Sequence, residues 1–156
     1  MDKEIKLTPI AFVKNTRVAI IDDNWSTVTS EIELAENLPE ECFDNIDTFS
    51  HLEIIFHLNQ TNKTIIGSEH PRNNTEWPKV GIFAQRKKDR PNHLGLTIVN
   101  LIKREGRKLT VTTLDAIDGT PILDIKPVLK EFLPQGEVFQ PKWSHELMKN
   151  YWIENK

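Results

Sequence analysis

Two forked, positively charged side chains stand in a proline-interrupted loop between two apolar stretches. Arg86 and Arg90 lie within residues 85–91, and each guanidinium presents paired donors suited to a carboxylate or a phosphate. Pro91 and Gly95 follow, and they fix or permit the unusual backbone that a loop folded around a ligand needs. The segment therefore predicts an anion-binding loop, although a solvated connection with its charges in water would have the same composition.

A second stretch places carboxylates among apolar residues. Residues 114–127 are largely apolar but contain three aspartates: Asp115, Asp118 and Asp124. A buried carboxylate costs free energy unless it is hydrogen-bonded or paired, and Lys126 is a candidate partner. The stretch fits either an aspartate-stabilised turn with an ion pair or a ligand site.

The elements that must position these residues have the composition of β-strands. Strands carry alternating or short apolar runs rich in Val, Ile and Thr. The stretches that fit are 5–13, 17–21, 28–34, 51–58, 80–84, 94–102, 108–114 and 121–125. Residues 104–107 have the length and the glycine placement of a hairpin turn. Many short strands with turn signals favour a closed or nearly closed barrel over a βαβ fold, so we predict one small, mostly-β barrel.

Helical signals are few. Residues 38–47 begin with Pro39 and two glutamates, which suits the first turn of a short helix, and residues 128–132 suggest a helical turn. From Ser144 to Ile153, a serine N-cap precedes an apolar face formed by Leu147, Met148, Tyr151 and Trp152. We therefore predict a barrel domain over residues 1–135, with a short helix before its central strands. A C-terminal extension with a helix would cover residues 136–156.

The two chemical segments together resemble a known family. Residues 80–96 resemble the pattern G-V-F-A-T-R-S-P-x-R-P-N-P-I-G-L, and residues 114–127 resemble L-D-x-x-D-G-T-P-x-x-D-I-K-P. Both patterns are those of the TsaA-like family, also known as the TrmO family. Residues 50–56 resemble its S-H-L-W-V-L-F strand, and residues 70–72 its H-P-R-G loop. The chain departs from the family at Gln85, at Lys87-Lys88 and at His93-Leu94, and we expect no counterpart of the long C-terminal domain of some members.

The resemblance implies a TsaA-like β-barrel, usually a homodimer, that binds S-adenosylmethionine outside a Rossmann fold. It also implies N6-methylation of threonylcarbamoyladenosine in tRNA. The chain indeed has no strand–G-x-G-x-x-G–helix signature.

Cofactor-binding residues are expected on both segments. Arg86 is the first candidate to hold the carboxylate of the cofactor, and Arg90 the second. The other expected contacts are Leu94, Gly95 and Leu96 on the adenine by backbone, Thr113, Leu114 and Asp115 on its other side, Asp118 on the ribose or ammonium, and Asn59 and Gln60 at the end of the 51–58 strand. Asp124 and Lys126 are assigned to structure.

No residue stands out as the catalytic base. Methyl transfer is an in-line displacement that gains from alignment, and a carbamoylated adenine nitrogen would benefit from a base. The candidates are His57, His70 and Asp118. The five histidines have no metal-ligand spacing, so we expect no metal. Cys42 is expected to be a small buried side chain.

An RNA partner would need a local basic patch, because the net charge of −3 provides no attractive field overall. Residues 86–90 and 103–108 form two basic clusters. Three tryptophans, Trp25, Trp77 and Trp143, are candidate base-stacking platforms or packing residues.

The chain is expected to be cytoplasmic, with no membrane partner. Its one cysteine suits a reducing compartment, and its first residues lack the apolar core of a signal peptide. Apolar runs such as Val18 to Ile21 fall far short of the about 20 residues that span a bilayer.

Three functions remain open at this point. The chain could methylate a modified adenosine of tRNA, methylate a small molecule with the same fold, or bind S-adenosylmethionine without catalysis.

Overall fold

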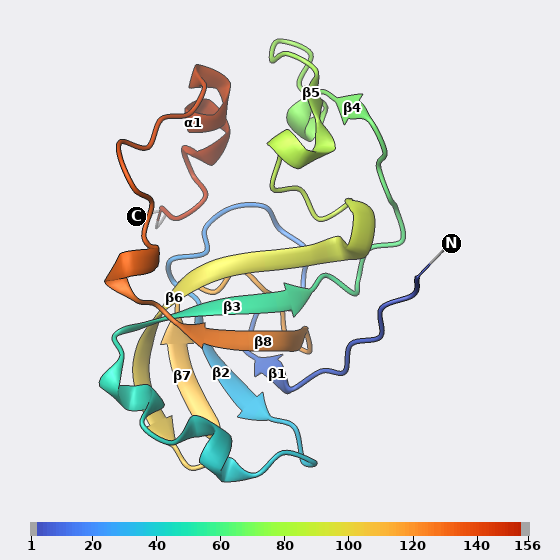
Figure 1. The fold of residues 1–156 in the computed structure, drawn as a ribbon. Coiled ribbons are helices and arrows are strands. Elements are labelled where there is room, and N and C mark those ends of the chain that lie inside the picture. The colour runs from blue at the N-terminus through green and yellow to red at the C-terminus, as the bar shows by residue number, and fades with distance from the viewer. Residues whose placement is uncertain (1–2, 154–156) are drawn as a thin grey trace.

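Six antiparallel strands close into a barrel in the computed structural model, which describes residues 3–153 (Figure 1). Their order around the barrel is β1-β2-β7-β6-β3-β8. The strands are β1 (Ala11–Lys14), β2 (Thr29–Leu34), β3 (His51–His57), β6 (Leu94–Glu105), β7 (Lys108–Thr112) and β8 (Pro121–Pro127). The short strands β4 (Ser68–Glu69) and β5 (Val80–Gly81) pair with each other outside the barrel. The predicted mostly-β barrel is confirmed.

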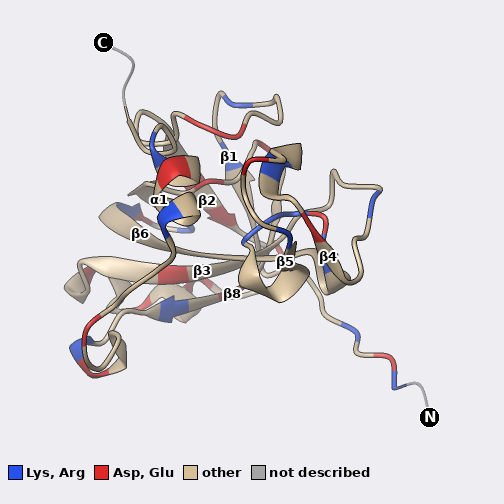
Figure 2. Cartoon of the chain, turned by 90° about the horizontal axis from the view of Figure 1, so that it is seen from above, with Lys and Arg blue, Asp and Glu red and all other residues tan. Residues whose placement is uncertain are grey.

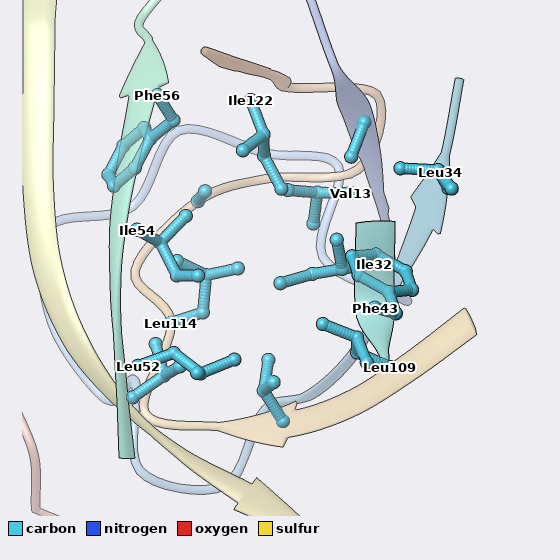
Figure 3. Close-up of a cluster of buried hydrophobic side chains, with 14 residues drawn as sticks. Val13, Ile32, Leu34, Phe43, Leu52, Ile54, Phe56, Leu109, Leu114 and Ile122 are labelled. Atoms are coloured by element: carbon cyan, nitrogen blue, oxygen red, sulfur yellow. The ribbon is translucent and has the colours of Figure 1, made fainter. Parts of the chain in front are cut away.

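The barrel interior is filled with apolar side chains. Along β3 the residues alternate between buried and half-buried, so that Leu52, Ile54 and Phe56 point inward. They meet Ile32 of β2 and Leu109 of β7, and Figure 3 shows these side chains converging on the barrel axis. Each such side chain contributes about 1.5–3 kcal/mol when it is fully buried. Because the interior is packed, a ligand site must lie outside it.

The hairpin between β6 and β7 forms as predicted. Glu105 pairs with Lys108, and Gly106 adopts a φ of 58° in the turn between them. The two partners of β6 cover different parts of it. Residues 94–100 of β6 pair with β3, whereas the pairing with β7 runs from Asn100 to Glu105. The first half of β6 therefore presents one edge that β7 does not cover.

The predicted strand at 17–21 is wrong, because this segment belongs to a loop between β1 and β2. The guanidinium of Arg17 donates to the carbonyl oxygens of Ile21 (2.9 Å), Asp23 (2.5 Å) and Asn24 (2.9 Å). It also lies 3.8 Å from the ring centre of Trp25. These contacts wrap the chain around one side chain, which an extended strand could not do. The predicted strand at 5–13 is likewise reduced to β1.

The short helix predicted at 38–47 is two separate 3₁₀ turns, at Glu40–Phe43 and Ile46–Thr48. Asn45 separates them with a φ of 61°, a left-handed conformation that a continuous helix cannot contain. Cys42 lies in the first turn and is exposed, contrary to expectation. The strand predicted at 80–84 is also shorter, since a 3₁₀ turn at Ile82–Ala84 follows β5.

The C-terminal helix is present, as α1 (Lys142–Met148), but it begins and ends earlier than predicted. The hydroxyl of Ser144 donates to the carbonyl oxygen of Pro141 at 2.6 Å, so Ser144 lies inside the first turn and is not its N-cap. Tyr151 and Trp152 follow the helix. The helical turn expected near residue 130 is confirmed at Lys130–Phe132. The proposed boundary at residue 135 stays a prediction, and residues 154–156 lie outside the described part.

Helix α1 and the β4–β5 pair lie at the same end of the barrel. Figure 1 shows α1 on one side and the β4–β5 pair on the other, with the first half of β6 passing beneath them. Among the helices that the structure describes, none is long and apolar enough to cross a membrane.

Candidate functional site

A cleft of about 1550 Å³ lies at this end of the barrel. Its floor is the outer face of the first half of β6. Its walls are the turn after β3, the loop 83–92, the loop 115–120 and the C-terminal segment 140–152. The volume exceeds the roughly 300–1,000 Å³ of a common small-molecule site. The cleft is therefore large enough for one ligand and part of a second one.

Eight of the eleven residues predicted to bind a cofactor line this cleft: Asn59, Gln60, Arg86, Arg90, Leu94, Gly95, Leu96 and Asp115. These residues come from four separate segments, which the barrel brings together. That they contact a cofactor stays a prediction.

The other three predicted residues are placed elsewhere. Leu114 is fully buried in the barrel core. The Thr113 hydroxyl donates to the carbonyl oxygen of Thr112 at 2.6 Å. Asp118 accepts a hydrogen bond from the backbone N–H of Asn15 at 3.0 Å, so its carboxylate stabilises a turn. We therefore leave these three residues out of the binding site considered below.

The uncovered edge of β6 offers backbone donors and acceptors to the cleft. The carbonyl oxygen of Leu96 accepts a hydrogen bond from Arg86, and that of Ile98 accepts one from Thr113 at 3.4 Å. Both groups thus point away from β3. Since the N–H and C=O of one strand residue point to the same side, the amide groups of these residues face the same edge. Such an edge can bind the hydrogen-bonding edge of a planar heterocycle.

The two predicted arginines differ in role. Arg86 is exposed and reaches the edge of β6 at Leu96. Arg90 instead donates to the carbonyl oxygens of Gln85 (2.6 Å) and Lys87 (3.4 Å). Arg90 therefore shapes the loop from within, whereas Arg86 has donors that can serve a ligand.

Asp115 is a carboxylate of the cleft that two hydroxyl groups hold. Its Oδ1 accepts a hydrogen bond from the hydroxyl of Thr97, and its Oδ2 accepts one from the hydroxyl of Tyr151. Burial raises the pKa of Tyr151 far above its ordinary value, and the charge of Asp115 and this hydrogen bond add to the effect. The phenol is therefore neutral and acts as a donor at physiological pH.

Sequence reasoning missed both partners of Asp115. It placed Tyr151 on the apolar face of a helix by spacing alone. A signal was present, because a tyrosine that is largely buried normally finds a partner for its hydroxyl. The sequence could not identify that partner, since it lies 36 residues away.

The lysines of the loop are engaged with acids. Lys87 lies 2.7 Å from Glu69, and Lys88 lies 3.6 Å from Asp89. Burial raises the pKa of Asp89, but the hydrogen bond from Thr61 (2.5 Å) and the two lysine charges outweigh it and lower this pKa overall. Seen from above in Figure 2, basic and acidic segments lie close together in the loops beside β4 and β5.

None of the three candidate bases lies on the cleft among the residues described. His70 Nδ1 lies 2.7 Å from the carbonyl oxygen of Trp77, and the ring of His57 lies edge-on to His93 at 6.4 Å. Asp118 bonds Asn15, as noted. Within residues 3–153 no group of three or more His, Cys, Asp or Glu is placed to hold a metal ion.

The tryptophans are engaged in packing contacts. Trp25 is buried beneath Arg17. The rings of Trp77 and Trp143 lie 6.4 Å apart at an angle of 42°, and the indole of Trp77 donates to Glu146 at 2.8 Å. Of the three, Trp25 and Trp143 line the cleft, whereas Trp77 does not.

The chain matches a described protein family and is similar to several known proteins. The family described as tRNA-methyltransferase O N-terminal domain matches residues 12–132. A probable S-adenosyl-L-methionine-binding protein of Archaeoglobus fulgidus is 38% identical over 114 residues, which cover 73% of this chain and 30% of that protein. The human tRNA (adenine(37)-N6)-methyltransferase is 36% identical over 121 residues, covering 76% of this chain and 27% of that enzyme.

A relative of similar length also exists. A probable S-adenosyl-L-methionine-binding protein of Methanothermobacter thermautotrophicus is 33% identical over 136 residues, which cover 83% of this chain and 94% of that protein. The crystal structure of TrmO from Pseudomonas aeruginosa superposes with a TM-score of 0.74 at 22% identity, covering 92% of this chain and 63% of that one. This last likeness supports the fold alone. The chain thus spans less than a third of the Archaeoglobus and human relatives.

Proposed function

The chain belongs to the family of tRNA-methyltransferase O N-terminal domains, and from this premise we propose that it is an S-adenosylmethionine-dependent methyltransferase acting on tRNA. The proposed acceptor is N6-threonylcarbamoyladenosine. The observation that carries the proposal is the placement of Arg86 and Asp115, which bond consecutive residues of β6, Leu96 and Thr97.

The residues of the cleft fit the chemical groups of S-adenosylmethionine. The guanidinium of Arg86 can bind a carboxylate through paired charge-assisted hydrogen bonds. The carboxylate of Asp115 can accept from an ammonium or a ribose hydroxyl. The edge of β6 at Leu96 can meet an adenine through backbone groups. Together these groups can serve the carboxylate, the ammonium or ribose, and the adenine of the cofactor.

The chain's own contribution to catalysis is alignment. When bound, S-adenosylmethionine supplies an electrophilic methyl group on a sulfonium. Asp115 and Arg86 would hold the donor on the floor of the cleft, and the walls would orient the acceptor nitrogen. Fixing two reactants in a reactive geometry can lower the barrier by about 7–11 kcal/mol.

The RNA substrate is supported by two observations. The human relative is named a tRNA (adenine(37)-N6)-methyltransferase. In addition, the cleft is lined by more basic than acidic residues: Lys63, Arg72, Arg86, Lys87, Lys88 and Arg90 against Asp22, Glu53, Asp89 and Asp115. This local excess of positive charge contrasts with the net charge of −3 for the whole chain.

The test is direct. Titration calorimetry with S-adenosylmethionine, after removal of metals by chelation, should give a saturable binding signal. Purified tRNA that carries threonylcarbamoyladenosine should then gain one methyl group on that nucleoside, as measured by mass spectrometry after digestion. Binding without methylation of any tRNA nucleoside would contradict the enzymatic proposal, and the absence of binding would contradict the cofactor.

We also propose that the active form is a cytoplasmic homodimer. Leu129, Phe132 and Leu133, which follow β8 and lie outside the cleft, leave 38–78% of their surface exposed. A row of exposed apolar side chains is typical of a surface that a partner covers, and a second copy is the proposed partner. Sedimentation velocity should give about twice the chain mass of 18.1 kDa. A single monomeric species at micromolar concentrations would contradict the dimer.

A further inference from the structure

The C-terminal segment 140–152 lies outside the family match and is bonded to the rest of the protein at several points. The match ends at residue 132, whereas the segment 140–152 lies over the cleft. The backbone N–H of Trp25 donates to the carbonyl oxygen of Tyr151 at 2.9 Å. The side chain of Trp77 binds Glu146 of α1 at 2.8 Å. The segment is thus a built wall of the cleft.

One of its contacts reaches a residue of the proposed cofactor site. The Tyr151 hydroxyl bonds one oxygen of Asp115 while the Thr97 hydroxyl bonds the other. A carboxylate oxygen has two acceptor positions, so each oxygen keeps one position for a further donor. With both oxygens held, the carboxylate cannot rotate freely.

We propose that Tyr151 is a positioning residue of the cofactor cleft, which fixes the Asp115 carboxylate so that its remaining acceptor positions meet the ammonium or ribose hydroxyls of S-adenosylmethionine. This inference rests on the proposed function. The proposal gives the C-terminal segment, which lies beyond the matched residues, a role in cofactor binding. None of the residues in the two motif segments supplies this role. The contact couples the cleft to α1 and, through Trp25, to the loop between β1 and β2.

The effect on binding follows from preorganisation. A carboxylate that is already oriented loses less freedom when the ligand binds. Loss of one hydrogen bond to a charged group changes an equilibrium by about tenfold or more. Removal of the phenol oxygen alone should therefore weaken cofactor binding by about tenfold while the aromatic packing remains. The ring centres of Tyr151 and Trp152 lie 4.9 Å apart, a contact that phenylalanine retains.

The alternative is that Tyr151 merely fastens the C-terminal segment. A matched control separates the two roles, because Trp77→Phe removes a different anchor of the same segment and keeps the aromatic contact with Trp143. If fastening were the whole role, Trp77→Phe and Tyr151→Phe would weaken binding equally. If Tyr151 acts through Asp115, only the tyrosine variant should weaken it.

The experiment measures the dissociation constant of S-adenosylmethionine by calorimetry for wild type, Tyr151→Phe, Asp115→Asn and the double variant. Circular dichroism would check folding. We expect Tyr151→Phe to raise the constant about tenfold in the wild-type background and less than about twofold in the Asp115→Asn background. Should the tyrosine variant unfold, Thr97→Val tests the same carboxylate from its other oxygen, and Thr97→Ser should restore binding.

The outcomes are distinct. If wild type binds the cofactor and Tyr151→Phe binds it equally tightly, this inference is overturned while the proposed function stands. The same holds if Trp77→Phe weakens cofactor binding as much as Tyr151→Phe does. Equal effects of Tyr151→Phe in both backgrounds would also overturn it. Wild type that does not bind the cofactor would overturn the proposed function and this inference together.

Discussion

The backbone of Gly95 lies directly against the ring of Phe56. A Cβ atom built at position 95 would stand 2.4 Å from Cε2 and 2.5 Å from Cζ of that ring. Phe56 closes the core at this end of the barrel, and Gly95 is part of the cleft floor. The position of β6 in the cleft is therefore set by contact with the core.

Gly95→Ala should destabilise the protein by overpacking. The added methyl group must displace the Phe56 ring or the strand, at a cost of about 1–3 kcal/mol in the free energy of unfolding. Urea denaturation measures the loss. Gly81→Ala is the control, because the nearest atom to its new Cβ is 4.0 Å away. Equal stability of the two variants would contradict the close contact, and Phe56→Leu should partly rescue Gly95→Ala.

Arg86→Ala should weaken binding of S-adenosylmethionine by about 1.5–3 kcal/mol, the contribution of a hydrogen bond to a charged group. The physical reason is that Arg86 is exposed at the edge of β6 and can pair with the carboxylate of the ligand. Calorimetry compares it with Lys103→Ala, which removes an exposed charge beyond the cleft. A dissociation constant equal to that of wild type would place Arg86 outside the binding site.

Asp89→Asn should lower stability at neutral pH and lose this effect in acid. The folded-state pKa of Asp89 is lowered, so its contribution is fully present above the unfolded value of about 3.9 and is lost as the pH falls through the folded value. We expect the free energy of unfolding of wild type to exceed that of the variant by about 1–3 kcal/mol at pH 5–7. The difference should shrink below about pH 4.

Urea denaturation at a series of pH values checks this. Glu105→Gln is the control, because it alters an exposed ion pair with Lys103 and should leave the curve nearly unchanged. A stability difference between wild type and Asp89→Asn that persists undiminished at pH 3 would mean that the ionised carboxylate is not its cause.

The barrel could be predicted from sequence because its determinants are local. The alternating or short apolar runs, the glycine of the β6–β7 turn and the two motif segments each indicate strands and their ends. The segment 17–21 shows where this reasoning fails. Its apolar run suits a strand, but Arg17 gathers three carbonyl groups of the following loop. Strand propensity contains no information about one side chain that binds several backbone groups.

The candidate site follows from the sequence only in part. Asp115 and Arg86, which the motif segments carry, both line the cleft, and their contact with a cofactor stays a prediction. Leu114 was assigned to the same site, but it lies in the core, because Thr113 with a φ of 65° breaks the alternation of β7 just before it. Tyr151 was missed, because its partner is set only by the path of the C-terminal segment across the closed barrel.

The last prediction concerns RNA and depends on which lysines are exposed enough to meet phosphates. Lys87 is already neutralised by Glu69 at 2.7 Å and leaves 21% of its side chain exposed. Lys63 and Lys88 line the cleft with greater exposure. Each phosphate contact adds somewhat less than one unit to the slope of log affinity against log salt. The double variant Lys63→Ala/Lys88→Ala should therefore weaken tRNA binding and flatten that slope by about one to two units.

Filter binding or fluorescence anisotropy over a range of salt concentrations measures the slope. Lys103→Ala/Lys108→Ala removes the same charge from the β6–β7 hairpin, outside the cleft, and should leave the slope unchanged. Lys87→Ala should lower stability more than it changes the slope, because it breaks the ion pair with Glu69. Affinity for S-adenosylmethionine should stay the same in the Lys63/Lys88 variant, since neither lysine is among the proposed cofactor contacts. A wild-type protein without measurable tRNA affinity at about 50 mM salt, where phosphate contacts are strongest, would contradict the RNA substrate itself.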